Sequence, residues 1–95
     1  MAELLFEIWR EGSEDGGSMM RVHPQNDKAR ALALPDAVLM HSFTARSAFE
    51  AFRHNNAWHG YSPWEPGEHR EDHVFTEEEA AEQRAYLAIR GDQAV

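Results

Sequence analysis

The strongest constraint on the fold is a two-residue alternation of apolar side chains near the start of the chain. In residues 4–11, LLFEIWRE, this alternation places Leu4, Phe6 and Ile8 on one face of an extended segment. Residues 19–23, MMRVH, resume the alternation after a polar, glycine-rich loop. A period of two is typical of half-buried β-strands, so the two segments predict a β-hairpin with a long tip.

A helix and a third strand are expected next. Residues 26–34 contain good helix formers, with Asn26 or Asp27 as the N-cap and Pro35 as the stop. Residues 37–44, AVLMHSFT, are rich in β-formers and largely apolar on both faces, which predicts a well-buried strand. A helical connection would make the second and third strands parallel, so the third strand most simply pairs antiparallel with the first.

Two capping boxes mark the starts of the last two helices. In each box a hydroxyl residue is followed three places later by glutamate: Ser47 with Glu50, and Thr76 with Glu79. The first helix is expected to end near Asn56 and the second to cover residues 77–90. The order β-β-α-β-α-α predicts an α+β fold in a single domain over residues 1–95. We expect a small two-layer sandwich, with a three-stranded sheet in the order 2-1-3 and the helices mainly on one face.

The chain is acidic, with a net charge of −8. Residues 1–47 hold seven acids against five bases, and residues 48–95 hold ten against four. Such a field repels phosphate groups, so we expect no direct binding to nucleic acid and no docking on an anionic membrane. A basic protein partner suits this charge better.

Composition disfavours several classes of protein. The chain has no cysteine, which excludes disulfides, thiolate zinc sites and cysteine nucleophiles. No apolar run reaches the length of about 18 residues that a membrane helix needs, and the acidic start differs from a secretory signal. Eight arginines beside a single lysine indicate a high-GC, bacterial source. We therefore expect a soluble, cytoplasmic bacterial protein without a targeting segment.

The connection between the last two predicted helices, residues 57–75, is long for a compact domain. Its large rings and its prolines favour an ordered, extended segment over a disordered one. The rings either seal the edge of a small core or form a surface that contacts a partner. The residues that we assign to partner binding are Trp58, Tyr61, Trp64, Glu65 and Glu68.

A histidine-rich turn in the same connection raises the question of a metal site. His69 and His73 stand four residues apart with Asp72 beside them, so one helical turn would direct all three toward one point. Imidazole and carboxylate groups are suitable ligands for zinc or nickel. The three residues form only half of a tight site, and a solvated acidic turn is the other interpretation. We expect no cofactor.

The sequence contains no glycine-rich phosphate loop, nucleophile motif or paired histidine and glutamate metal signature. The leading hypothesis is a non-catalytic protein that acts through the aromatic connection and the neighbouring acidic residues. One alternative is a metal-dependent or general acid/base enzyme that uses His69, Asp72 and His73. Another is an acidic decoy that blocks a basic nucleic-acid-binding protein. A homodimer is a further hypothesis, because Leu5 and Trp9 lie on a strand face that three helices scarcely cover.

Overall fold

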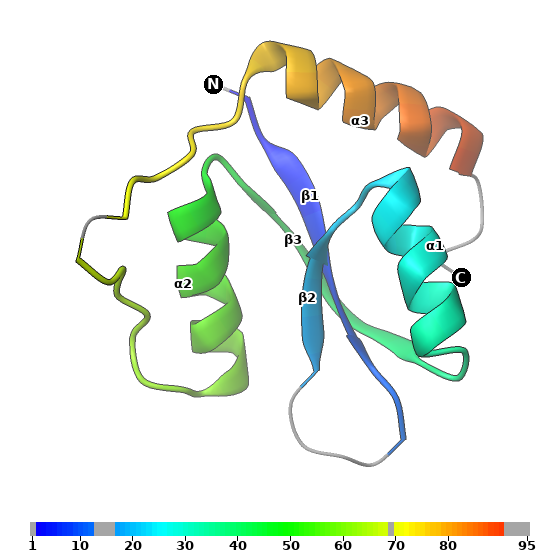
Figure 1. Ribbon diagram of the computed structural model, residues 1–95, viewed down its shortest axis with the longest axis horizontal. Coiled ribbons are helices and arrows are strands. Elements are labelled where there is room, and N and C mark those ends of the chain that lie inside the picture. Colours follow the sequence, from blue (N-terminus) through cyan, green and yellow to red (C-terminus); the bar gives the residue numbers. More distant parts are fainter. Residues whose placement is uncertain (1, 13–16, 69, 91–95) are drawn as a thin grey trace.

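The computed structural model describes residues 2–12, 17–68 and 70–90, and these form a three-stranded antiparallel sheet with three helices (Figure 1). The elements in chain order are β1 (Leu4–Arg10), β2 (Ser18–Arg21), α1 (Pro24–Ala33), β3 (Val38–Ala45), α2 (Ala48–His59) and α3 (Glu77–Arg90). This order confirms the α+β fold, and the strand order β2-β1-β3 confirms the predicted 2-1-3 arrangement. No helix of the described residues is long and apolar enough to cross a lipid bilayer.

The main hydrophobic core lies on one face of the sheet, where α2 covers it. Phe6 of β1 is the register partner of Phe43 of β3, and their rings stack with centroids 5.6 Å apart. Phe75, from the segment before α3, adds a third ring at 5.8 Å from Phe6. The predicted alternation places Leu4 and Ile8 on the same face, where both are fully buried. The core around these side chains also contains Ala2, Ala45, Ala51 and Ala80.

Helix α1 and the C-terminal end of α3 cover the opposite face of the sheet, whereas Ala80, near the start of α3, packs in the main core. Trp9 is buried there under Arg30 of α1, whose guanidinium carbon lies 3.7 Å from the ring centroid. Glu7 is buried on the same face and pairs with Arg90 at the end of α3. Two of the three described helices therefore share one face, as expected, and α2 covers the other. Figure 1 shows α2 to the left of the strands and α1 to the right.

The exposed apolar side chains of the sheet lie on β3. Val38 is 60 % exposed and Met40 is 37 % exposed, so the prediction that both faces of this strand are well buried is wrong. The reason is that β3 is an edge strand, and on this face α1 and α3 contact β1 at Trp9 and Glu7. The homodimer hypothesis rests on thin cover over Trp9, which is only 6 % exposed. Homodimerisation stays a prediction.

Both predicted capping boxes begin a helix. Ser47 Oγ accepts a hydrogen bond from Glu50 N, and Thr76 Oγ1 accepts one from Glu79 N. In the second box the bond is reciprocal, because Glu79 Oε1 also accepts from Thr76 N at 3.0 Å. The helix predicted over residues 77–90 is confirmed at both ends.

The start predicted for α1 is wrong. The helix begins at Pro24, and His23 is its N-cap, because His23 Nδ1 accepts a hydrogen bond from Gln25 N. Neither Asn26 nor Asp27 takes this role. Asp27 is instead buried against α3, where its carboxylate forms an ion pair with Arg90.

Gln83 fastens α3 to the sheet where β2 has ended. Its Oε1 accepts from Leu5 N at 2.7 Å, and its Nε2 donates to Leu5 O at 3.0 Å and to Val22 O at 3.0 Å. The side-chain amide of Gln83 thus bonds to backbone groups of Leu5 and Val22, next to the end of β2 at Arg21. This contact sets the position of α3 across the end of β1.

Candidate functional site

The connection between α2 and α3 wraps around the outer side of α2 (Figure 1). α2 continues to His59, beyond the predicted end at Asn56, and Gly60 ends it by adopting a left-handed φ of 77°. Tyr61 N then donates to Asn56 O at 2.9 Å, and Asn56 Nδ2 donates to Ser62 O at 3.1 Å. These bonds turn the chain back along the helix.

The far end of the connection is bonded to the chain that precedes α2. An antiparallel bridge joins Ser47 to Val74, and Phe75 N donates to Arg46 O at 3.0 Å. The Phe75 ring is buried in the core beside Phe6. The connection is therefore attached to the body of the protein at both ends.

Trp64 anchors the middle of the connection on α2. Phe49 and Phe52 are three residues apart on the helix and so share one side of it. The Trp64 ring stacks on Phe52 at a centroid distance of 4.9 Å and meets Phe49 edge to face at 5.0 Å. Trp64 is half-buried by these contacts, so the fold sets the orientation of its ring.

A groove of about 440 Å³ lies between α2 and the connection. It is lined by Arg53, Ala57, Tyr61, Pro63, Trp64 and Glu65. Tyr61 is 54 % exposed, yet its ring is stacked on the ring of His59 with centroids 4.8 Å apart. The groove thus presents two aromatic side chains that are already held in place. Tyr61, Trp64 and Glu65 are three of the five residues that the sequence assigns to partner binding.

The other two residues assigned to partner binding lie outside this groove. Trp58 is 36 % exposed and stacks on His41 of β3 with centroids 5.5 Å apart. Glu68 is exposed and lies farther along the connection. The structure therefore brings three of the five side chains together and places Trp58 toward the sheet.

The residues assigned to a metal site have other partners. Asp72 Oδ1 accepts a hydrogen bond from Phe49 N at 2.9 Å, and His73 Nε2 lies 2.9 Å from Glu79 Oε1. His69 lies outside the described residues. Within the described part of the chain, no three histidine, aspartate or glutamate side chains are grouped as a metal ion requires. A metal site that includes His69 stays a prediction.

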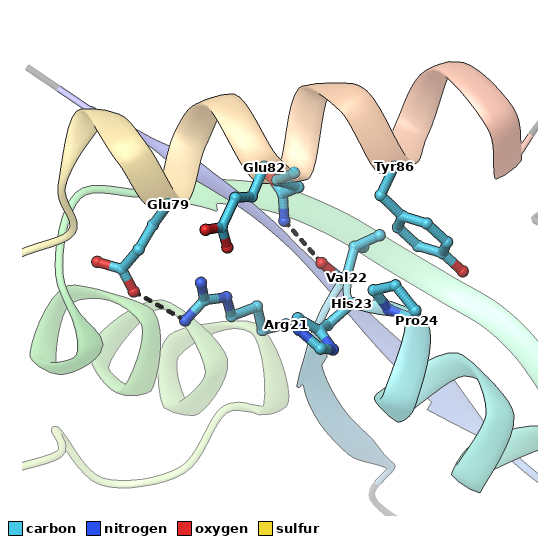
Figure 2. Close-up of a pocket in the computed structure, with 8 residues that line it drawn as sticks. Arg21, Val22, His23, Pro24, Glu79, Glu82 and Tyr86 are labelled. Carbon is cyan, nitrogen blue, oxygen red and sulfur yellow. Dashed lines mark hydrogen bonds and ion pairs between the residues drawn. The ribbon is translucent and has the colours of Figure 1, made fainter.

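A second, smaller pocket lies between α3 and the junction of β2 with α1 (Figure 2). It has a volume of about 160 Å³ and is lined by Arg21, Val22, His23, Pro24, Glu79, Glu82, Gln83 and Tyr86. Figure 2 shows Glu79 directed toward Arg21, and their ion pair measures 3.1 Å. The Tyr86 hydroxyl donates to Asp27.

Two titratable groups of this pocket are not poised for proton transfer near neutral pH. Burial raises the pKa of Glu79, but hydrogen bonds from Thr76 and His73, together with the charge of Arg21, outweigh it and lower this pKa to about 2. Burial raises the pKa of Tyr86. Glu79 therefore stays ionised and Tyr86 stays protonated, which gives no support to general acid/base chemistry at these two groups.

Sequence reasoning missed a pair of histidines that joins β3 to α2. His41 Nε2 and His54 Nε2 lie 3.1 Å apart, so one ring donates to the other. The His54 ring also stacks on Phe43 with centroids 3.9 Å apart. Burial and the neighbouring His41 lower the pKa of His54. No local motif signals this pair, because 13 positions separate its members.

A buried ionic cluster on the α1 and α3 face was also missed. Glu7, Asp27 and Arg90 are 3 %, 6 % and 5 % exposed, and both carboxylates pair with the guanidinium. Glu7 is the one signal in the sequence, because it is an acid between Phe6 and Ile8 in a buried strand. The cluster is enclosed, and its ion pairs join β1, α1 and α3.

No model of a protein family matches this chain, and no curated protein and no solved structure matches it significantly.

Proposed function

We propose that the protein is a non-catalytic binding protein that holds an extended segment of a partner protein in the groove between α2 and the connection. The observation that carries this proposal is the exposed Tyr61 ring beside the anchored Trp64 ring in one groove. Tyrosine and tryptophan are the residues that most often dominate binding energy at protein interfaces. Binding sites are usually concave, with apolar and aromatic walls and a few polar groups, and the groove has these features. Such a groove encloses more of a peptide segment than a flat surface can.

The rigidity of the groove supports the same proposal. Trp64 rests on Phe49 and Phe52, and Tyr61 rests on His59, so neither ring must be ordered when a partner arrives. Side chains that are fixed in advance lose little conformational entropy on binding. More of the contact energy is then expressed as affinity.

The charge around the groove favours a basic partner. Glu65 and Arg53 both line the groove, and the chain from Glu65 onward, residues 65–82, holds eight carboxylates against the single cation of Arg70, with Glu79 of this set paired to Arg21. Such a field attracts lysine- and arginine-rich segments and weakens when salt screens it. The acidic decoy hypothesis draws on the same charge, but it does not explain the aromatic groove. A bacterial, cytoplasmic setting belongs to the proposal and is supported by the absence of cysteine and the preference for arginine.

A random-peptide display selection tests the proposal. The parent protein, the variant Tyr61→Ala and the control Leu32→Ala are each used as bait, because Leu32 is an exposed apolar residue on α1, away from the groove. We expect the parent and Leu32→Ala to enrich the same basic peptides, and Tyr61→Ala to enrich none of them. Peptides that bind all three proteins equally, or no enriched sequence at all, would contradict the proposal.

The same selection separates the proposal from the acidic decoy. A decoy would bind basic peptides through the acidic surface alone, so Tyr61→Ala would keep them and high salt would release them from every bait. Under the proposal, Glu65→Gln weakens binding and Tyr61→Ala abolishes it at low salt as well.

A further inference from the structure

Resting on the proposed function, we infer that the groove selects proline-containing segments that carry arginine or lysine and bind in the polyproline II conformation. The partner class follows from the shapes, the hydrogen-bonding groups and the charge of the groove.

The shape of the groove fits flat, rigid rings. Tyr61, Pro63 and Trp64 form its apolar part, and the two aromatic rings are held at fixed orientations by other rings. A polyproline II segment has three residues per turn and is already extended before binding, so two of its prolines can pack on such rings at small entropic cost.

The hydrogen-bonding groups of the groove match prolines, whose backbone offers acceptors and no donor. Proline has no backbone N–H, so a proline-rich segment presents carbonyl oxygens and needs donors from its partner. The Tyr61 hydroxyl, the Trp64 indole N–H and the Arg53 guanidinium make no hydrogen bond with any described residue, and the guanidinium lies 6.0 Å from the Phe49 ring centroid, where its charge acts on Asp72. All three belong to residues that line the groove.

Strand addition is a poorer fit to this place. A peptide that adds to a sheet needs a free strand edge with alternating donors and acceptors. The lining residues belong to α2 and to a part of the connection that forms no strand. The groove therefore offers side-chain donors and rings instead of a backbone ladder.

The charge of the groove selects the flanking residues of the segment. Glu65 lines the groove, so an arginine or lysine next to the prolines can meet its carboxylate. Arg53 on the α2 side favours the carbonyl oxygens and disfavours a second cation there. The preferred ligand thus has its basic residue at the Glu65 end.

Fluorescence anisotropy with labelled synthetic peptides tests the inference. The probe is a peptide of three Pro-Pro-Arg repeats, and the matched controls are three Ala-Ala-Arg repeats and three Pro-Pro-Glu repeats. We expect the Pro-Pro-Arg peptide to bind the parent at least about tenfold more tightly than either control. Trp64→Phe, which keeps a packed ring and removes the indole N–H, and Tyr61→Ala should both weaken that binding, whereas Leu32→Ala should not.

The outcomes separate this inference from the proposed function. If the Ala-Ala-Arg peptide binds as tightly as the Pro-Pro-Arg peptide, or if only proline-free peptides from the display selection bind in the groove, this inference is overturned and the proposed function stands. If neither the synthetic peptides nor any selected peptide depends on Tyr61, both are overturned.

Discussion

Arg90, the last residue of α3, and Glu7, in the central strand β1, form a two-point ion pair inside the protein although 83 positions separate them. Arg90 Nη1 donates to Glu7 Oε2 at 3.0 Å, and Nη2 donates to Oε1 at 2.7 Å. Arg90 Nε also lies 2.9 Å from Asp27 Oδ2 of α1. One guanidinium thus joins β1, α1 and α3, and the bonds to Glu7 raise the pKa of Arg90.

Arg90→Ala should destabilise the protein by about 3 to 5 kcal/mol, because it leaves two buried carboxylates without their cation. The measurement is urea unfolding followed by tryptophan fluorescence. The matched control is Arg84→Ala, an exposed arginine on the same helix, whose effect should stay within about 0.5 kcal/mol. Equal unfolding midpoints for the two variants would show that the ion pair holds nothing together.

Trp64→Ala should lower the unfolding free energy by about 2 to 3 kcal/mol, below the cost of removing a fully buried tryptophan, because the ring is half-buried on Phe49 and Phe52. Tyr61→Ala should change stability by less than about 0.5 kcal/mol, because that ring is mostly exposed. Thermal and urea unfolding of both variants check this. A large loss with Tyr61→Ala would mean that its effect on peptide binding reflects unfolding.

The lowered pKa of Glu79 predicts an acid-dependent contribution to stability. This pKa falls from 4.5 to about 2 in the folded protein, so the contribution is present above pH 4.5 and disappears as the pH falls toward 2. With 22 % of the side chain exposed, the contribution is about 1 to 3 kcal/mol. Glu79→Gln, measured against the parent by urea unfolding between pH 7 and pH 2, should therefore differ most near pH 7 and converge with the parent at pH 2. If the difference in unfolding free energy between the parent and Glu79→Gln does not change with pH, the lowered pKa of Glu79 is contradicted.

Chelation should leave the melting temperature unchanged, because Asp72 and His73 already bond to Phe49 and Glu79. The test compares the untagged parent with the double variant His69→Ala, His73→Ala in calorimetry with and without EDTA. A bound metal stabilises the folded state according to its occupancy, so its removal lowers the melting temperature. A fall of several degrees in the parent alone would favour the metal-dependent alternative.

Features that depend on neighbouring residues could be predicted from the sequence. The alternation around Phe6 gave the first strand, and Thr76 with Glu79 located the start of α3, because strand faces and caps are set within a few residues. The start of α1 was missed because Asp27, a good N-cap by type, bonds instead to Tyr86 and Arg90, which lie 59 and 63 positions away. The residues that neighbour Asp27 in the sequence do not indicate partners so far along the chain.

The site was predictable in part for the same reason. Rings and prolines in one long connection predict a binding segment, and the structure places Tyr61, Trp64 and Glu65 along one groove. Their role in binding stays a prediction. Trp58 is of the same residue type but lies against His41 of β3, and only the packing of α2 on the sheet decides this. The exposed side of β3 depended likewise on where α1 and α3 are placed.

The most direct test of the groove is a two-dimensional ¹H–¹⁵N NMR titration that follows the indole N–H signals of the three tryptophans. Trp64 lines the groove, Trp58 lies outside it, and Trp9 is buried with its Nε1 bonded to Glu7 at 3.1 Å. The signals are assigned from Trp64→Phe and Trp58→Phe, and the titrant is the most enriched peptide of the display selection. We predict that the Trp64 indole signal moves progressively to saturation while the Trp9 signal stays in place. A bound peptide that leaves the Trp64 signal unmoved would contradict the groove as the binding site.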